Sequence, residues 1–350
     1  MTTFAQLTTT QVSQAEADLI EPETRDALAE AYFELADRDE PFLVIGGGSN
    51  TIVSDDGFDG PVLRVATRGV EYRPGEGGEV IVVAHAGESW SELVDATVAR
   101  GLSGIEALAG IPGSVGATPV QNIGAYGQEL ADVLVRVEVA DADAGERRWV
   151  AAADLGLGYR TSALKREELL GLVLAVELRL REVDSTGGAP VQYAQLAKAL
   201  DVELGERVPV AQQREAVLRL RASKGMVLDP SDVDTRSSGS FFMNPIVRRS
   251  FASEALPASA PRFDAGKDAE GLELVKLSAA WLIEHAGVKK GFALPGSGAA
   301  ISSKHTLAIT NHADATAEQI AELARYVRAR VLAEFGVELI PEPNLIGLQL

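Results

Sequence analysis

Hydrophobic and polar positions repeat along the chain with two different periods, which predict a mixture of helices and strands. Apolar residues at helical spacing mark residues 22–38, 89–100, 209–223, 276–285 and 316–335. Short runs of strand-forming residues mark residues 42–45, 79–84, 133–140 and 172–180. Strands therefore outnumber helices in the first half of the chain.

Two of the predicted helices carry clear end signals. The segment 316–335 opens with Thr316 and Gln319, the spacing of a capping box, and stops at Gly336. The segment 89–100 is followed by Gly101, which suits the left-handed residue after a helix. We expect both helices to have these bounds.

Changes of composition predict where the domains divide. Residues 183–190 are polar, contain two glycines and end in proline, as a linker does. We therefore predict one domain over residues 1–182, a connecting segment over 183–208 and a second domain over 209–350. Residues 248–268 are rich in Ala, Ser and Pro without periodicity, which predicts an exposed excursion.

The segment 110–127 is the most unusual stretch of the chain because it combines many glycines with few large side chains. Glycines let the backbone adopt positive φ and bring amide N–H groups close to an anion, while small residues leave room above them. Loops of this length without a function are uncommon. The segment is typical of a surface that binds a pyrophosphate.

A second glycine run, Gly46, Gly47 and Gly48 with Ser49 and Asn50, follows the predicted strand 42–45. A Rossmann dinucleotide fingerprint needs a third glycine where this chain has Thr51, and a helix that no pattern here supports. A Rossmann domain is therefore disfavoured.

Length, charge and cysteine content narrow the function classes. The 350 residues are too many for one compact core, which favours two or three domains. A formal net charge of −19 argues against broad binding of nucleic acid or anionic membranes, so a phosphate-bearing ligand needs local cations and amides. The chain has no cysteine, which excludes disulfides and thiolate chemistry, and we expect no metal site. No secretory signal or membrane-spanning run is visible, and we expect a cytoplasmic monomer.

Five motifs in order resemble those of the UDP-N-acetylenolpyruvoylglucosamine reductase family. They are the two glycine segments, Gly158-Tyr159-Arg160-Thr161-Ser162, Gly239-Ser240-Phe241-Phe242-Met243-Asn244-Pro245, and Pro341-Glu342-Pro343-Asn344. The resemblance covers nearly the whole chain. It implies an α+β fold: a vanillyl-alcohol-oxidase/PCMH-type FAD-binding domain of two subdomains, plus a C-terminal α/β substrate-binding domain. In that domain a last strand at 338–340 would return Glu342 to the flavin.

The resemblance also implies a reaction. The family uses NADPH and non-covalent FAD to reduce an enolpyruvyl ether on a UDP-sugar to the lactyl ether, in peptidoglycan precursor synthesis. Negative charge develops beside the substrate carboxylate, so the site needs a cation and a proton donor. The resemblance assigns charge stabilisation to Arg160 and Glu342, and proton donation to Ser240. Since Glu342 would face a carboxylate, we expect it to be protonated or to share a proton during turnover.

Binding roles follow from the same resemblance. Substrate-binding residues are Tyr159, Tyr193 on the mobile loop of one subclass, Lys224, Asn244 and His305, which stands where a glutamine is often found. The FAD-binding residues are Gly46, Gly47, Gly48, Ser49, Asn50, Gly110, Ile111, Pro112, Gly113, Ser114, Gly116, Asn122, Gly124 and Tyr126. Residues 8–13 depart from the family's usual entry sequence, so we assign no site to residues 1–20.

Two other functions stay open. One is a different FAD-dependent oxidase or dehydrogenase with the same cofactor fold, acting on an alcohol or hydroxy acid. The other is a non-catalytic nucleotide-binding protein, for which the glycine segments alone would suffice. Measuring which substrate the protein converts tests the first alternative. A purified protein that is colourless and cannot be reconstituted with FAD would favour the second.

Overall fold

The computed structural model describes residues 1–38 and 40–350, which divide into two compact units. The Arg160 unit comprises Asp18–Gly48, apart from residue 39, and Asp59–Ser223. The Ser240 unit comprises Met1–Ala17, Ser49–Phe58 and Lys224–Leu350. Each unit therefore combines segments that are distant in the sequence.

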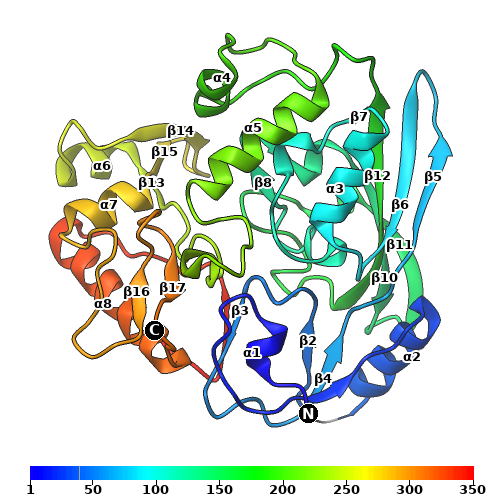
Figure 1. The fold of residues 1–350 in the computed structure, drawn as a ribbon, viewed down its shortest axis with the longest axis horizontal. Helices are drawn as coiled ribbons and strands as arrows, with labels where there is room; N and C mark the ends of the chain where they lie inside the picture. The colour runs from blue at the N-terminus through cyan, green and yellow to red at the C-terminus, as the bar shows by residue number, and fades with distance from the viewer. Residues whose placement is uncertain (39) are drawn as a thin grey trace. The chain divides into compact units, whose positions relative to one another are not determined.

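The Arg160 unit is built on an antiparallel sheet with the strand order β11-β10-β12-β6-β5, in which β7 pairs with the end of β12 (Figure 1). Its strands are β5 (Val70–Pro74), β6 (Glu79–His85), β7 (Leu102–Ser103), β10 (Leu134–Asp141), β11 (Glu146–Ala151) and β12 (Gly171–Glu182). The central strand β12 is buried on both faces over residues 172–178. This explains its nearly continuous apolar sequence, which is typical of a strand covered on both sides.

Smaller elements complete this unit. A parallel sheet has the order β1-β4-β2, and β8 and β9 form a short antiparallel pair. The bounds are β1 (Asp18–Ile20), β2 (Leu43–Ile45), β4 (Pro61–Arg64), β8 (Gly124–Ala125) and β9 (Gln128–Glu129), with helices α2 (Arg25–Ala36), α3 (Trp90–Ala99), α4 (Ala194–Leu200) and α5 (Val210–Ala222). Short 3-10 turns span Glu106–Leu108, Val115–Ala117, Leu130–Asp132 and Ala152–Leu155.

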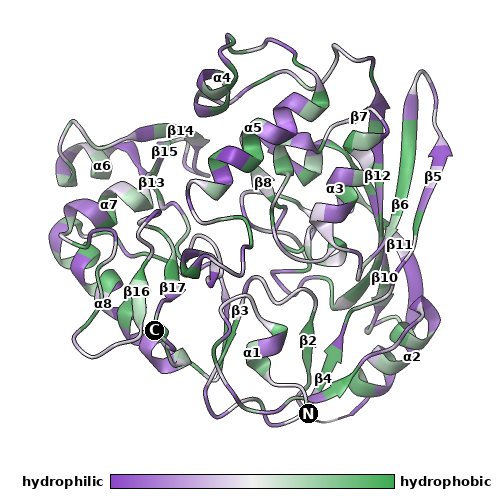
Figure 2. Cartoon of the chain, viewed as in Figure 1, coloured by the Kyte–Doolittle hydropathy of each residue, from purple (hydrophilic) through white to green (hydrophobic). Residues whose placement is uncertain are grey.

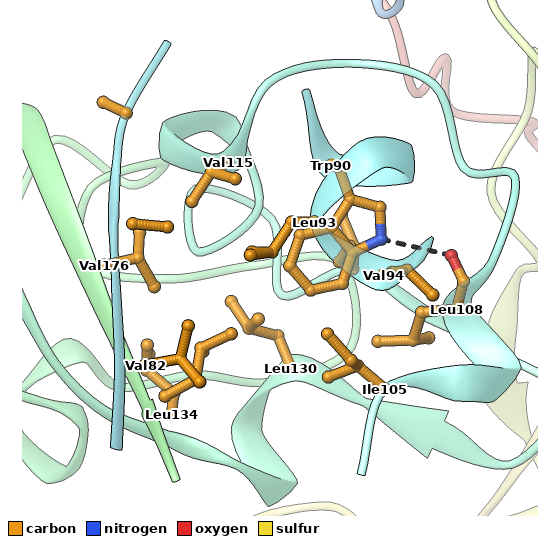
Figure 3. Packing of buried hydrophobic residues seen from close by; sticks show 14 of the residues in the cluster. Val82, Trp90, Leu93, Val94, Ile105, Leu108, Val115, Leu130, Leu134 and Val176 are labelled. Atoms are coloured by element: carbon orange, nitrogen blue, oxygen red, sulfur yellow. Dashed lines mark hydrogen bonds between the residues drawn. The ribbon is translucent and has the colours of Figure 1, made fainter. Parts of the chain in front are cut away.

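The core of the Arg160 unit includes residues of the glycine-rich segment. Trp90 is fully buried and its indole Nε1 donates a hydrogen bond to the carbonyl of Leu108 at 3.1 Å (Figure 3). Around it pack side chains from β6, α3 and β12, together with Val115 from the glycine-rich segment. Because a buried indole needs a partner for its N–H, this bond ties residues 105–115 to the core.

The Ser240 unit contains three small sheets and a long helix. β13, β15 and β14 form an antiparallel sheet, β16 pairs with β17, and β18 runs parallel to β3. The bounds are α1 (Phe4–Leu7), β3 (Thr51–Val53), a 3-10 turn Val233–Thr235, β13 (Ile246–Arg248), α6 (Arg249–Ala255), β14 (Arg262–Lys267), β15 (Glu273–Leu277), α7 (Ala279–His285), β16 (Ala299–Ile301), β17 (Ile309–Asn311), α8 (Ala317–Phe335) and β18 (Asn344–Ile346).

The long helix α8 confirms the prediction made from its end signals. Thr316 accepts a hydrogen bond from the N–H of Gln319, the capping box is complete, and Gly336 follows in the left-handed conformation. Hydrophilic and hydrophobic residues both occur along the helix (Figure 2), and its apolar face is buried in the core of the unit. No helix among residues 1–38 and 40–350 is long and apolar enough to cross a membrane.

Three predictions about the second half of the chain were wrong. Residues 248–268 are mostly exposed, as predicted, but they are not irregular: they contain α6 and β14, and Ala252, Leu256 and Ala260 are buried. The helix predicted over 276–285 begins only at Ala279, because residues 276 and 277 belong to β15. The last strand is β18 and not residues 338–340. In each case pairing with a distant strand decided the structure, which local periodicity does not record.

Candidate active site

The two glycine segments lie against each other in the Arg160 unit. A Cβ atom on Gly47 would lie 2.7 Å from the Cα of Gly113, and a Cβ on Gly46 would lie 2.3 Å from Ser114 Oγ. The N–H of Trp90 donates to the carbonyl of Gly113 at 3.0 Å, so the buried helix start holds the second segment in place. The two backbones approach so closely that a side chain at Gly46 or Gly47 would clash with the other segment. This suits an anionic pyrophosphate, and the residues fit the cofactor expected from the sequence.

The side chain of Arg160 lies against the end of the glycine-rich segment. Its Nη2 donates to the carbonyl of Gly124 at 3.1 Å, and its guanidinium lies 5.5 Å from the centre of the Tyr159 ring. Gly124 leaves room for this approach, since a Cβ there would lie 2.9 Å from Glu129 Cγ and 3.6 Å from Arg160 Nη1. The structure therefore places a cation beside the proposed cofactor loop.

A second arginine and two tyrosines lie near this cation. The rings of Tyr126 and Tyr193 meet edge to face with their centres 5.6 Å apart. Burial lowers the pKa of Arg221 to about 10, with a further lowering from the charge of Arg160 opposed by Tyr126. Burial likewise raises the pKa of Tyr126 above its ordinary value. Two guanidinium groups thus share one region of a strongly acidic chain, an arrangement that attracts an anionic ligand.

Tyr193 lies at the beginning of α4, which the sequence did not predict. It occupies the N-cap position, and its side chain is 46% exposed. The segment expected to be a loop therefore contains a helix of seven residues. An exposed tyrosine at the start of a short helix is suited to contact a ligand.

In the Ser240 unit, backbone hydrogen bonds join the segments that carry Ser240 and Glu342. The N–H of Glu342 donates to the carbonyl of Phe241 at 2.8 Å, and the N–H of Met243 donates to the carbonyl of Ile340 at 3.0 Å. The N–H of Phe241 donates in turn to the carbonyl of Leu307 at 2.8 Å. Phe241 and Phe242 are both buried, so backbone hydrogen bonds and core packing both fix this segment.

Asn50 also holds the segment that carries Glu342. Its Nδ2 donates to the carbonyl of Glu342 at 3.1 Å, and its own carbonyl accepts from the N–H of Asn344 at 2.9 Å. The parallel pairing of β18 with β3 continues from this point. Asn50, predicted from the sequence to bind the cofactor, therefore also holds the backbone of the proposed catalytic glutamate.

The other predicted substrate residues of this unit lie in well-supported turns. Asn244 Oδ1 accepts from the N–H of Ala279 at 2.9 Å, at the start of α7. The N–H of His305 donates to Ser302 Oγ at 3.1 Å, within a turn that ends at Leu307. Lys224 is the first residue of the Ser240 unit and is half-buried. Their roles toward the substrate stay predictions.

Sequence analysis did not identify two buried or partly buried residues, one in each unit, that lie close to predicted site residues. Arg221 lies in the last turn of α5, and its place near the end of a basic helix was the only signal in the sequence. Asp234 is 4% exposed and accepts from the N–H of Ser303 at 2.8 Å and from its hydroxyl at 2.6 Å. No local pattern distinguishes Asp234 from the neighbouring acidic residues.

Comparison with known proteins agrees with both halves of the fold. Residues 17–150 match the family described as FAD binding domain, and residues 229–346 match UDP-N-acetylenolpyruvoylglucosamine reductase, C-terminal domain. The chain is 54% identical to the UDP-N-acetylenolpyruvoylglucosamine reductase of Leifsonia xyli, over 98% of each chain, and 48% identical to that of Saccharopolyspora erythraea, over 99% of this chain and 95% of the relative. The crystal structure of the Thermus caldophilus enzyme of that name superposes with a TM-score of 0.65 at 27% identity, covering 99% of this chain and 97% of the other.

Proposed function

Because the chain belongs to the UDP-N-acetylenolpyruvoylglucosamine reductase family, it is an FAD-dependent oxidoreductase of peptidoglycan precursor synthesis, and we propose that its reductant is NADPH. The proposed reaction converts UDP-N-acetylglucosamine enolpyruvate to UDP-N-acetylmuramate in the cytoplasm. We expect the protein to work as a monomer, without nucleic acid, membrane or metal. One observation carries this proposal: the guanidinium of Arg160 is held against the glycine-rich segment, at the carbonyl of Gly124.

The amides of the glycine segments would hold FAD without a covalent bond. When bound and reduced by NADPH, FAD would supply the hydride for the vinyl carbon of the substrate. Closely packed backbone at Gly47 and Gly113 suits the pyrophosphate of this cofactor, because amide N–H groups there are not screened by side chains.

Arg160 is proposed to stabilise the negative charge that develops next to the substrate carboxylate. A guanidinium remains protonated at any working pH and presents several N–H donors in a plane, which matches a carboxylate. Arg221 supports this role by adding positive charge to the same region. Glu342, protonated or sharing a proton, would donate a hydrogen bond to the charge without repelling it.

Ser240 is proposed to donate the proton that completes the reduction at the carbon next to the carboxylate. A serine hydroxyl is a weak acid, so its position must be fixed relative to the carbon that it protonates. The backbone bonds of Phe241 to Leu307 and Glu342 supply this rigidity immediately after Ser240. Tyr159, Tyr193, Lys224, Asn244 and His305 are proposed to bind the UDP-sugar.

The experiment follows flavin absorbance when the purified protein is mixed anaerobically with NADPH and then with the enolpyruvyl UDP-sugar. We expect bleaching by NADPH and recovery of the colour when the sugar is added, with formation of UDP-N-acetylmuramate. Bleaching without recovery would leave the flavin protein intact but reject the proposed substrate. A colourless protein that cannot be reconstituted with FAD would reject the proposal altogether.

A further inference from the structure

Arg160 has a backbone conformation that needs support from its surroundings. Its φ is +55°, in the left-handed region that few residues other than Gly, Asn and Asp adopt. It lies in a two-residue turn closed by hydrogen bonds from Gly158 N–H to Thr161 O at 3.1 Å and from Thr161 N–H to Gly158 O at 3.3 Å. The turn alone does not fix the orientation of the arginine relative to the glycine-rich segment.

Asn122 supplies a connection between this turn and the glycine-rich segment. Its Nδ2 donates both to the carbonyl of Gly158 at 3.2 Å and to Glu129 Oε2 at 3.1 Å, while its Oδ1 accepts from the N–H of Ala131 at 3.0 Å. The residue is only 2% exposed. Both amide hydrogens are therefore directed at protein groups, although the sequence placed Asn122 among the cofactor-binding residues.

We propose that the side chain of Asn122 is a positioning residue for Arg160, an inference that rests on the catalytic role proposed for that arginine. Asn122 fixes the carbonyl of Gly158 at the base of the turn, and the guanidinium of Arg160 closes the loop by donating to Gly124 O, two residues beyond Asn122. A second hydrogen bond joins the same two segments: Ser162 Oγ donates to the carbonyl of Val120 at 2.6 Å. The cofactor loop and the arginine turn thus form one hydrogen-bonded body.

Asparagine suits this position for two independent reasons. Its own φ is +45°, which asparagine tolerates better than most residues. Its amide also offers two donors and an acceptor on one short side chain, and all three are used here. An aspartate would keep the conformation but would lose both donors and place its charge beside the carboxylate of Glu129.

The experiment compares Asn122→Gly, which keeps the backbone conformation and removes the side chain, with the holoenzyme of the unaltered protein. We expect kcat to fall between about tenfold and a hundredfold, because small displacements of a catalytic group have effects of this size. Combined with Arg160→Ala, Asn122→Gly should cause no further loss. Glu167→Gly, at an exposed left-handed position of the same unit, is the matched control and should leave kcat unchanged.

A structural readout separates positioning from other roles. In crystals of the Asn122→Gly holoenzyme we expect Arg160 to leave φ near +55° or its Nη2 to lose contact with Gly124 O. An unmoved Arg160, or losses that multiply in the double variant, would overturn the inference. Full turnover in Arg160→Ala alone would instead reject the proposed catalytic role, while the crystal comparison still tests the positioning. Should Asn122→Gly fail to fold, Asn122→Asp is subjected to the same two measurements with the same expectations.

Discussion

The two units hold their proposed catalytic residues by different means. In the Arg160 unit the functional loops depend on side chains, such as Asn122 and Ser162, that bond to the backbone of another segment. Three non-glycine residues of these loops, Asn122, Tyr126 and Arg160, have positive φ. In the Ser240 unit, backbone hydrogen bonds join the segments that carry Ser240 and Glu342.

This difference predicts how each unit responds to mutation. A backbone hydrogen bond survives most side-chain substitutions, so replacing Ser240 or Glu342 should remove chemistry and leave the geometry unchanged. A loop that is held by side-chain hydrogen bonds loses them when those side chains are replaced. Substitutions away from the reacting atoms should therefore also disturb function in the Arg160 unit. The following predictions test this comparison, from the largest expected effect to the smallest.

Ser240→Ala should give the largest loss. We expect turnover to fall by about 10²- to 10⁴-fold, the usual contribution of a positioned proton donor. FAD content, melting temperature and bleaching by NADPH should stay as in the unaltered protein, because Phe241 keeps its backbone bonds. Stopped-flow absorbance separates the two half-reactions, and turnover that survives undiminished would refute the role of Ser240.

Gly47→Ala should disturb the other unit through its backbone. The added methyl group would lie 2.7 Å from the Cα of Gly113, so one segment must shift. Overpacking of this kind costs about 1–3 kcal/mol, which would weaken FAD binding by roughly 5- to 150-fold. Titrating the apoprotein with FAD and following flavin fluorescence measures the affinity.

Gly46→Ala is the graded comparison for this experiment. Its methyl group would meet the hydroxyl of Ser114 at 2.3 Å, and a hydroxyl can rotate away where a backbone atom cannot. We expect a smaller loss of affinity than for Gly47→Ala. Equal affinity in all three proteins would show that the two glycine segments are not packed as tightly as the comparison requires.

Asp234→Asn tests a buried side chain that supports a turn of the Ser240 unit. Burial favours the neutral acid, but the hydrogen bonds from Ser303 and Ser302 outweigh it and hold the pKa of Asp234 below its ordinary value of 3.8. The stabilisation is therefore complete above that value and is lost as the pH falls through the lower pKa of the folded protein. At neutral pH the substitution should cost about 1–3 kcal/mol, the scale of bonds to a buried charge.

Urea unfolding at several pH values measures this effect. The deficit of Asp234→Asn should be largest at neutral pH and should shrink as the pH falls below 3.8 and through the lowered pKa of the native aspartate. Asp264→Asn is the control, since that side chain is 81% exposed and its loss should change stability little. A deficit that does not vary with pH would mean that the charge of Asp234 does not stabilise the turn 302–305.

Local patterns by themselves determined much of this protein. The capping box of Thr316 and the stop at Gly336 defined α8, and the apolar runs located β6, β10 and β12 to within a few residues. These predictions succeeded because helix ends and buried strands depend on neighbouring residues. The order of the glycine, arginine, serine and glutamate motifs likewise indicated the enzyme family, since each motif is a local chemical requirement.

Only the tertiary structure decided which distant segments support one another. β3 pairs with β18 across nearly three hundred residues, and Asn50 reaches the carbonyl of Glu342 at the edge of that pair. Residues 262–267 form a strand because they pair with β15. The same holds for Asn122 and Asp234. The contribution of a buried polar side chain depends on the groups to which it is hydrogen-bonded, and the sequence does not show which groups these are.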